Sequence, residues 1–204
     1  MKTSNFALAG LLVLAAGCAS VADEETAQKA LAVMKASFSE KGQAKLDRLE
    51  QDETQKACSR PASDPLSKDE AARIEKVNLT AIKYPADGKL LGDWREGEKI
   101  AQSGVGMQFS DNPKNPAGGN CYACHQMSKT EISFGTIGPS LYQFGKLRGN
   151  SEAIQRYTWG KVWNSNAFTA CSNMPRFGHN RILTDKQVKD VTALLLDPAS
   201  PVNQ

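Results

Sequence analysis

The sequence predicts an all-α fold. Apolar residues recur at helical spacing, as in Leu31, Met34 and Phe38. Two further apolar runs are preceded by capping boxes, at residues 67–70 and 184–187. Almost every periodic stretch has this helical spacing, and no β-rich alternating stretch precedes residue 121. The 204 residues are enough for a leader and one domain with a substantial core.

Residues 1–22 are expected to be a secretory signal peptide. Lys2 precedes an apolar run, residues 6–16, that is too short to cross a bilayer. The small residues before and at Ala22 predict cleavage there. Cys18 offers an alternative, because L-A-A-G-C at residues 14–18 resembles a bacterial lipobox, although its leucine stands one place early. Both routes imply export to the periplasm, and lipidation of Cys18 would add a membrane tether.

Residues 23–83 are expected to form a helical N-terminal extension. Gly42 is predicted to end its first helix, and a second, weakly amphipathic helix is predicted from Leu46 towards Cys58. The run R-P-A-S-D-P then predicts a linker, and Ser67 caps a third helix. Because this region holds no cluster of ligand-type or catalytic residues, we interpret it as a packing or partner-docking extension.

Residues 84–204 are expected to form the domain that carries the chemistry. Asp93 is predicted to cap a helix that ends before Gly104. A second helix is predicted to begin after Ser151, and a last one after Thr184. Between the first two helices, a loop rich in Gly, Pro and Asn leads to residue 121.

The run G-N-C-Y-A-C-H-Q at residues 119–126 contains the motif C-x-x-C-H, formed by Cys121, Cys124 and His125. This spacing brings two thiols within reach of the vinyl groups of one porphyrin, and the next residue supplies an imidazole for the iron. We therefore predict one covalently bound haem c. A zinc site or a redox-active dithiol is the alternative, but the chain lacks a second ligand pair and a βαβ context.

Gly138 and Pro139 follow the motif and resemble the Gly-Pro of class I cytochromes c, which supplies a carbonyl to the other ring nitrogen of the histidine. Such a hydrogen bond would fix the orientation of His125. The order of helix, haem motif, loop, helix, ligand loop and C-terminal helix is that of a class I cytochrome c. The predicted fold is thus a class I cytochrome c fold with an N-terminal helical extension.

Met174 is the expected distal ligand of the iron. Pro175 biases it towards the extended backbone that suits a ligand loop. His179 or an open position are the alternatives, and three other methionines are weaker candidates: Met34, Met107 and Met127. Coordination by histidine and methionine would leave the iron without an open site and raise its reduction potential, which favours electron transfer over oxygen chemistry.

The remaining cysteines of the exported chain are Cys58 and Cys171. In an oxidising compartment an unpaired thiol is a liability, so we expect them to form a disulfide. Two separate thiols, one of them bonded to a partner, are the alternative. The formal net charge of +3 without clustered basic residues gives no indication of nucleic-acid binding.

Four segments together resemble the SoxX cytochrome family, the small subunits of the SoxAX complexes of sulfur-oxidising bacteria. They are G-N-C-Y-A-C-H at 119–125, I-G-P-S-L at 137–141, M-P-R-F-G at 174–178 and L-L-D-P-A-S-P-V-N at 195–203. The resemblance covers roughly residues 84–204. The longer extension, Cys58 and Cys171 depart from the general pattern of that family.

This resemblance implies the electron-transfer subunit of a periplasmic L-cysteine S-thiosulfotransferase. The implied partner is a SoxA-like dihaem or monohaem cytochrome, which would hold the catalytic haem and join thiosulfate to a cysteine of a SoxY-type carrier protein. The electrons released would pass through the haem held by Cys121, Cys124, His125 and Met174 to a small cytochrome c. The chain alone would then not be catalytic.

Overall fold

The computed structural model describes residues 13–204, with side chains described from residue 25. Residues 1–12 of the expected leader lie outside this part, as do the side chains of Cys18 and Ala22. All regular elements of residues 13–204 are helical, which confirms the predicted all-α class. No helix among these residues is long and apolar enough to span a bilayer. The chain divides into two compact units at residue 50.

The N-terminal unit contains α1 (Val13–Ser37) and a 3-10 helix (Leu46–Leu49). The predicted stop at Gly42 is wrong by several residues, because α1 already ends at Ser37. Gly42 instead has a φ of +54° within the turn that joins Lys41 to Ala44. A glycine adopts this left-handed conformation without the penalty that a Cβ would bring.

The helix predicted from Leu46 towards Cys58 consists of two separate elements, the 3-10 helix and α2 (Glu53–Cys58). Glu50, with φ −93° and ψ 127°, is extended and interrupts the helical path. Asp52 then begins α2 through a capping box with Gln55. The sequence pattern D-x-x-Q at residues 52–55 is typical of a capping box and indicates that a new helix begins here.

The second unit, Gln51–Gln204, contains α2, α3 (Lys68–Thr80), α4 (Trp94–Gln102), α5 (Phe144–Arg148), α6 (Glu152–Trp163) and α7 (Asp185–Leu196). The four expected caps are present, since the side chains of Ser67, Asp93, Ser151 and Thr184 each accept a hydrogen bond from a backbone N–H of the following turn. These caps define where α3, α4, α6 and α7 begin.

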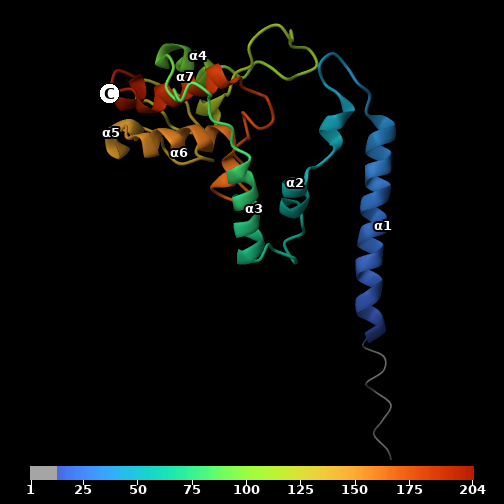
Figure 1. Ribbon diagram of the computed structural model, residues 1–204. Helices are drawn as coiled ribbons and strands as arrows, with labels where there is room; N and C mark the ends of the chain where they lie inside the picture. Colours follow the sequence, from blue (N-terminus) through green and yellow to red (C-terminus); the bar gives the residue numbers. More distant parts are fainter. Residues whose placement is uncertain (1–12) are drawn as a thin grey trace, which may run out of the picture. The chain divides into compact units, whose positions relative to one another are not determined.

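The central element of this unit is α7, which lies beside α4 and α6 (Figure 1). Its first half contributes Val188 and Val191 to a core with α6. Its second half contributes the run 194–196 to a core around Tyr122. Gly97 permits the close crossing of α4 and α7, because a Cβ there would lie 2.1 Å from the carbonyl oxygen of Asp190.

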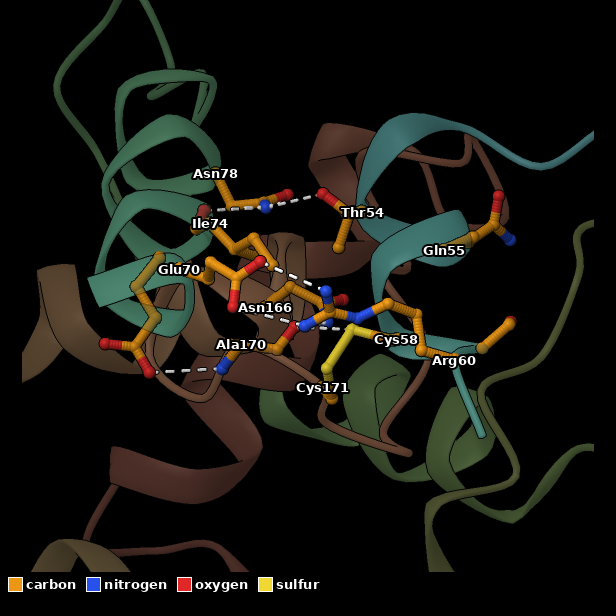
Figure 2. The surroundings of a disulfide bond; sticks show 12 residues. Thr54, Gln55, Cys58, Arg60, Glu70, Ile74, Asn78, Asn166, Ala170 and Cys171 are labelled. Atoms are coloured by element: carbon orange, nitrogen blue, oxygen red, sulfur yellow. Dashed lines mark hydrogen bonds and ion pairs between the residues drawn. A yellow bond between two sulfur atoms is a disulfide. The ribbon is translucent and has the colours of Figure 1, made fainter. Parts of the chain in front are cut away.

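The extension expected at residues 23–83 is divided between the two compact units, because α2 and α3 belong to the same unit as residues 84–204. The amide of Asn164, at the end of α6, donates to the side-chain oxygen of Asn78 on α3 at 2.9 Å. The amide of Asn78 donates to the hydroxyl of Thr54 on α2 at 3.0 Å, as Figure 2 shows. Buried amides thus join α2, α3 and α6.

The C-terminal run L-D-P-A-S-P-V-N covers the end of α7. Ser200 is fully buried and its hydroxyl donates to the carbonyl of Leu194. The amide of Asn203 donates to the carbonyls of Leu195 and Asp197, at 3.1 and 2.9 Å. These side chains satisfy carbonyls that a helix terminus leaves without a partner.

Candidate haem site

The motif C-x-x-C-H is a tight turn at the end of the loop that follows α4. Asn120 has a left-handed φ of 46°, and a 3-10 turn follows over Cys121–Ala123. The backbone N–H groups of Cys124 and His125 both donate to the carbonyl of Cys121, at 3.1 and 2.9 Å. The N–H of Gly119 donates to the carbonyl of Ile100 at 2.8 Å, which anchors the motif to α4.

His125 is held by the Gly-Pro pair that follows the motif. Its Nδ1 lies 2.7 Å from the carbonyl oxygen of Pro139. With Nδ1–H as the donor, Nε2 keeps its lone pair for a metal. The N–H of Gly138 donates to the carbonyl of Cys124 at 2.8 Å, and a Cβ at Gly138 would lie only 2.2 Å from the imidazole Cε1. The missing side chain at Gly138 therefore makes the space in which the ring stands.

A small cavity with an apolar lining lies between the motif and the helices α6 and α7. Both expected axial residues border it, together with Cys121 and a set of apolar side chains: Met127, Leu141, Val162, Phe177, Leu183, Val191 and Leu195. The thiol of Cys121, an imidazole, a thioether and an apolar wall are donors and surroundings that suit a covalently bound haem, whereas Cys124, the second cysteine of the motif, does not border the cavity. The residues present therefore fit this group.

Met174 lies in the loop between α6 and α7. Its carbonyl accepts a hydrogen bond from the Ser165 hydroxyl at 2.5 Å, and its N–H donates to the Ser172 hydroxyl at 3.2 Å. The backbone of Met174 is thus held on both sides of its Cα atom, while the thioether borders the cavity. Of the weaker candidates, Met127 also borders this cavity, Met107 does not, and Met34 belongs to the N-terminal unit.

His179 does not border the cavity. Its ring stands edge to face against Trp163, with 5.9 Å between the ring centroids, and its Nε2 lies 3.9 Å from a carboxylate oxygen of Asp52. Burial and the nearby Arg176 lower the pKa of His179, against the opposite effect of Asp52. The structure thus places the alternative ligand outside the cavity that contains Met174 and His125.

The zinc and dithiol alternatives find no support in the geometry. Among the residues that the structure describes, no three His, Cys, Asp or Glu side chains converge as a metal site. Burial raises the pKa of the Cys121 thiol to about 12. Thiol exchange needs a thiolate, which a raised pKa disfavours.

Cys58 and Cys171 form a disulfide with an S–S distance of 2.05 Å and a Cα–Cα distance of 5.5 Å (Figure 2). The predicted pairing is therefore confirmed, and the alternative of two separate thiols is excluded. Cys121 and Cys124 take no part in this disulfide. The bond joins the end of α2 to the loop that carries Met174, three residues before the methionine.

Two polar contacts near this disulfide were not anticipated from the sequence. A guanidinium nitrogen of Arg176, which is 6% exposed, donates to a carboxylate oxygen of Asp52 at 2.7 Å. Burial alone would raise the pKa of Asp52, but hydrogen bonds from Gln55 and Arg176 hold it below its ordinary value. The N–H of Ala170 donates to the Glu75 carboxylate at 3.1 Å. The sequence pattern around Asp52 indicates the capping box, but it does not indicate the buried partner Arg176, which lies 124 residues away.

Comparison with known proteins gives two matches. Residues 96–197 match the family Cytochrome c. The chain is also 39% identical over 156 residues to a protein of Aquifex aeolicus (strain VF5) described as an uncharacterized lipoprotein, and the match covers 76% of this chain and 73% of that protein. Because the family match includes Cys121, Cys124, His125 and Met174, and spans half of the sequence, the chain belongs to the cytochrome c family, whose members hold haem c covalently.

Proposed function

We propose that this protein is a single-haem electron-transfer cytochrome in which His125 and Met174 are the axial ligands of the iron. The observation that carries the proposal is the cavity that both side chains border, on the side of the motif where Cys121 also lies. Two protein ligands leave the iron no open position. The protein then carries electrons without binding a substrate at the metal.

When bound, the haem supplies a reversible one-electron couple of its iron. The chain contributes the environment that tunes this couple. The Pro139 carbonyl accepts the hydrogen bond from Nδ1, which fixes the ring of His125 and raises its basicity as a ligand. Apolar side chains such as Val191 and Leu195 exclude water from the cavity wall. A thioether ligand and a dry wall both favour a high reduction potential.

For its biological setting, the proposal is the SoxX role in a SoxAX complex. A SoxA-like cytochrome would join thiosulfate to a cysteine of a SoxY-type carrier protein, and its electrons would leave one at a time through this haem to a small cytochrome c. The resemblance of residues 84–204 supports this role. Copurification with a SoxA-like protein tests it, and purification as a lone carrier would favour a freestanding electron-transfer cytochrome.

The proposed location is the periplasm, with a lipid at Cys18 as the anchor. The relative described as a lipoprotein supports the lipid over release after Ala22. The intact mass of the mature protein decides between the two forms. A chain that begins at lipidated Cys18 is heavier than one that begins at residue 23, by five residues and the attached acyl chains.

The near-infrared spectrum of the oxidised, haem-loaded protein tests the ligand pair, because a methionine-to-iron(III) band is absent from bis-histidine sites. We expect the band in the wild type and its loss in Met174→Leu, which conserves side-chain volume without offering a comparable ligand. Met107→Leu is the matched control, since Met107 does not border the cavity. A wild type without the band would instead favour His179 as the ligand or an open site. Rapid CO binding to the ferrous state would favour an open site, and with it a haem enzyme or sensor.

A further inference from the structure

The loop that carries Met174 is attached to α2 and α3 by three links of different kinds. One is the disulfide between Cys58 and Cys171. The second is the ion pair of Asp52 with Arg176, at 2.7 Å. The third, described above, is the hydrogen bond to the Glu75 carboxylate on α3.

These links lie on both sides of the methionine in the sequence. The residues they hold stand four and three positions before Met174 and two positions after it. A loop fixed at both flanks loses most of the conformations in which its central residue moves away from the cavity. The links to α2 and α3 therefore restrict the motion of the loop on both sides of Met174.

We propose that residues 51–80 act as a clamp on the distal loop, with Asp52, Cys58 and Glu75 as positioning residues that keep Met174 at the iron. The inference rests on Met174 being the ligand, as stated under the proposed function. It gives α2 and α3 a task in the chemistry of the site, although none of their residues borders the cavity.

The charge of Arg176 makes the ion pair a directional part of this clamp. The arginine side chain is only 6% exposed, so removing the carboxylate would leave a buried cation without its partner. Such a group is best relieved by movement of its loop towards water. Because Arg176 is two residues from Met174, that movement would draw the methionine away from the cavity.

Binding of free imidazole to the oxidised, haem-loaded protein reports on this movement. Imidazole must displace the methionine, so its apparent dissociation constant is inversely proportional to the fraction of molecules in which the loop is open. We expect a fall of about tenfold in the double variant Cys58→Ser/Cys171→Ser, and of about threefold in Asp52→Asn and Glu75→Ala. Asp52→Asn keeps an oxygen that can cap α2 and thus isolates the charge pair.

Asp87→Asn is the matched control, because it removes another exposed carboxylate that pairs at 2.7 Å with a cation far along the chain, Lys189. Its partner lies on α7, not on the distal loop. This control should leave imidazole binding unchanged. Glu75→Gln should restore wild-type binding, since its side-chain oxygen can still accept the hydrogen bond of Ala170.

The near-infrared band and the far-ultraviolet circular dichroism, followed together on heating, separate a clamp from a purely structural role. In the clamp variants the methionine band should be lost well before the helices unfold, whereas a purely structural effect would lower both midpoints together. Unchanged imidazole affinity in folded Asp52→Asn and Glu75→Ala would overturn the clamp, even if the double variant failed to fold. A wild type without the band would instead overturn the proposed ligand pair.

Discussion

Replacing Gly138 with alanine should destabilise the protein by about 2–4 kcal/mol. The new Cβ would lie 2.2 Å from Cε1 and 2.5 Å from Nδ1 of His125, whereas ordinary contacts are about 3.5–4.0 Å. The ring must retreat by more than about 1 Å, which breaks its 2.7 Å contact with the Pro139 carbonyl. Overpacking costs about 1–3 kcal/mol and the lost hydrogen bond about 0.5–1.5 kcal/mol.

The assay is guanidinium unfolding of the haem-loaded protein, followed by circular dichroism. Gly104→Ala is the control, because the nearest neighbours of its Cβ would be side-chain atoms of Asn120, the closest being Nδ2 at 3.3 Å. Alanine there should leave stability within about 1 kcal/mol of the wild type. If Gly138→Ala were as stable as Gly104→Ala, the imidazole would not be confined by the backbone at residue 138, and the reasoning would be refuted.

Two further predictions concern parts of the unit away from the haem. Asn203→Ala should cost about 2–4 kcal/mol in the same assay, because its buried amide donates to two carbonyls at the end of α7, and an unchanged midpoint would contradict this role. For Glu70, hydrogen bonds from the backbone and hydroxyl of Ser67, and then from Arg60, lower the pKa from 4.5 to about 2. The ionised Glu70 therefore stabilises the protein fully above pH 4.5, and this stabilisation is lost as the pH falls towards 2. In a plot of unfolding free energy against pH, Glu70→Gln should therefore show a smaller loss on the acid side than the wild type. Parallel plots for the two proteins would show that the carboxylate does not contribute.

Local sequence signals predicted the helices well wherever a cap was readable. Ser67, Asp93, Ser151 and Thr184 each begin a helix as expected, because a cap acts on its own next turn. The prediction failed between Leu46 and Cys58, where an apolar spacing was followed across an extended residue. The short helix α5 was also not predicted, since five residues carry too little periodicity to be recognised.

The haem motif, the Gly-Pro pair and the candidate ligand loop were all readable as short strings of sequence. What the sequence left open was which side chains share one cavity. The structure places Met174 and His125 around the same cavity and His179 beside Asp52, outside it. That distinction depends on packing between distant helices, which local spacing does not encode.

By itself, the sequence determined the helical class and the starts of the main helices, and it predicted haem attachment at Cys121 and Cys124, because each depends on residues within one or two turns. It also supplied the expectation of a disulfide from the number of cysteines alone. Only the tertiary structure decided that α2 and α3 belong to the same compact unit as the haem motif. The contact of Arg176 with Asp52 crosses 124 positions, and such a contact exists only once the intervening helices have packed.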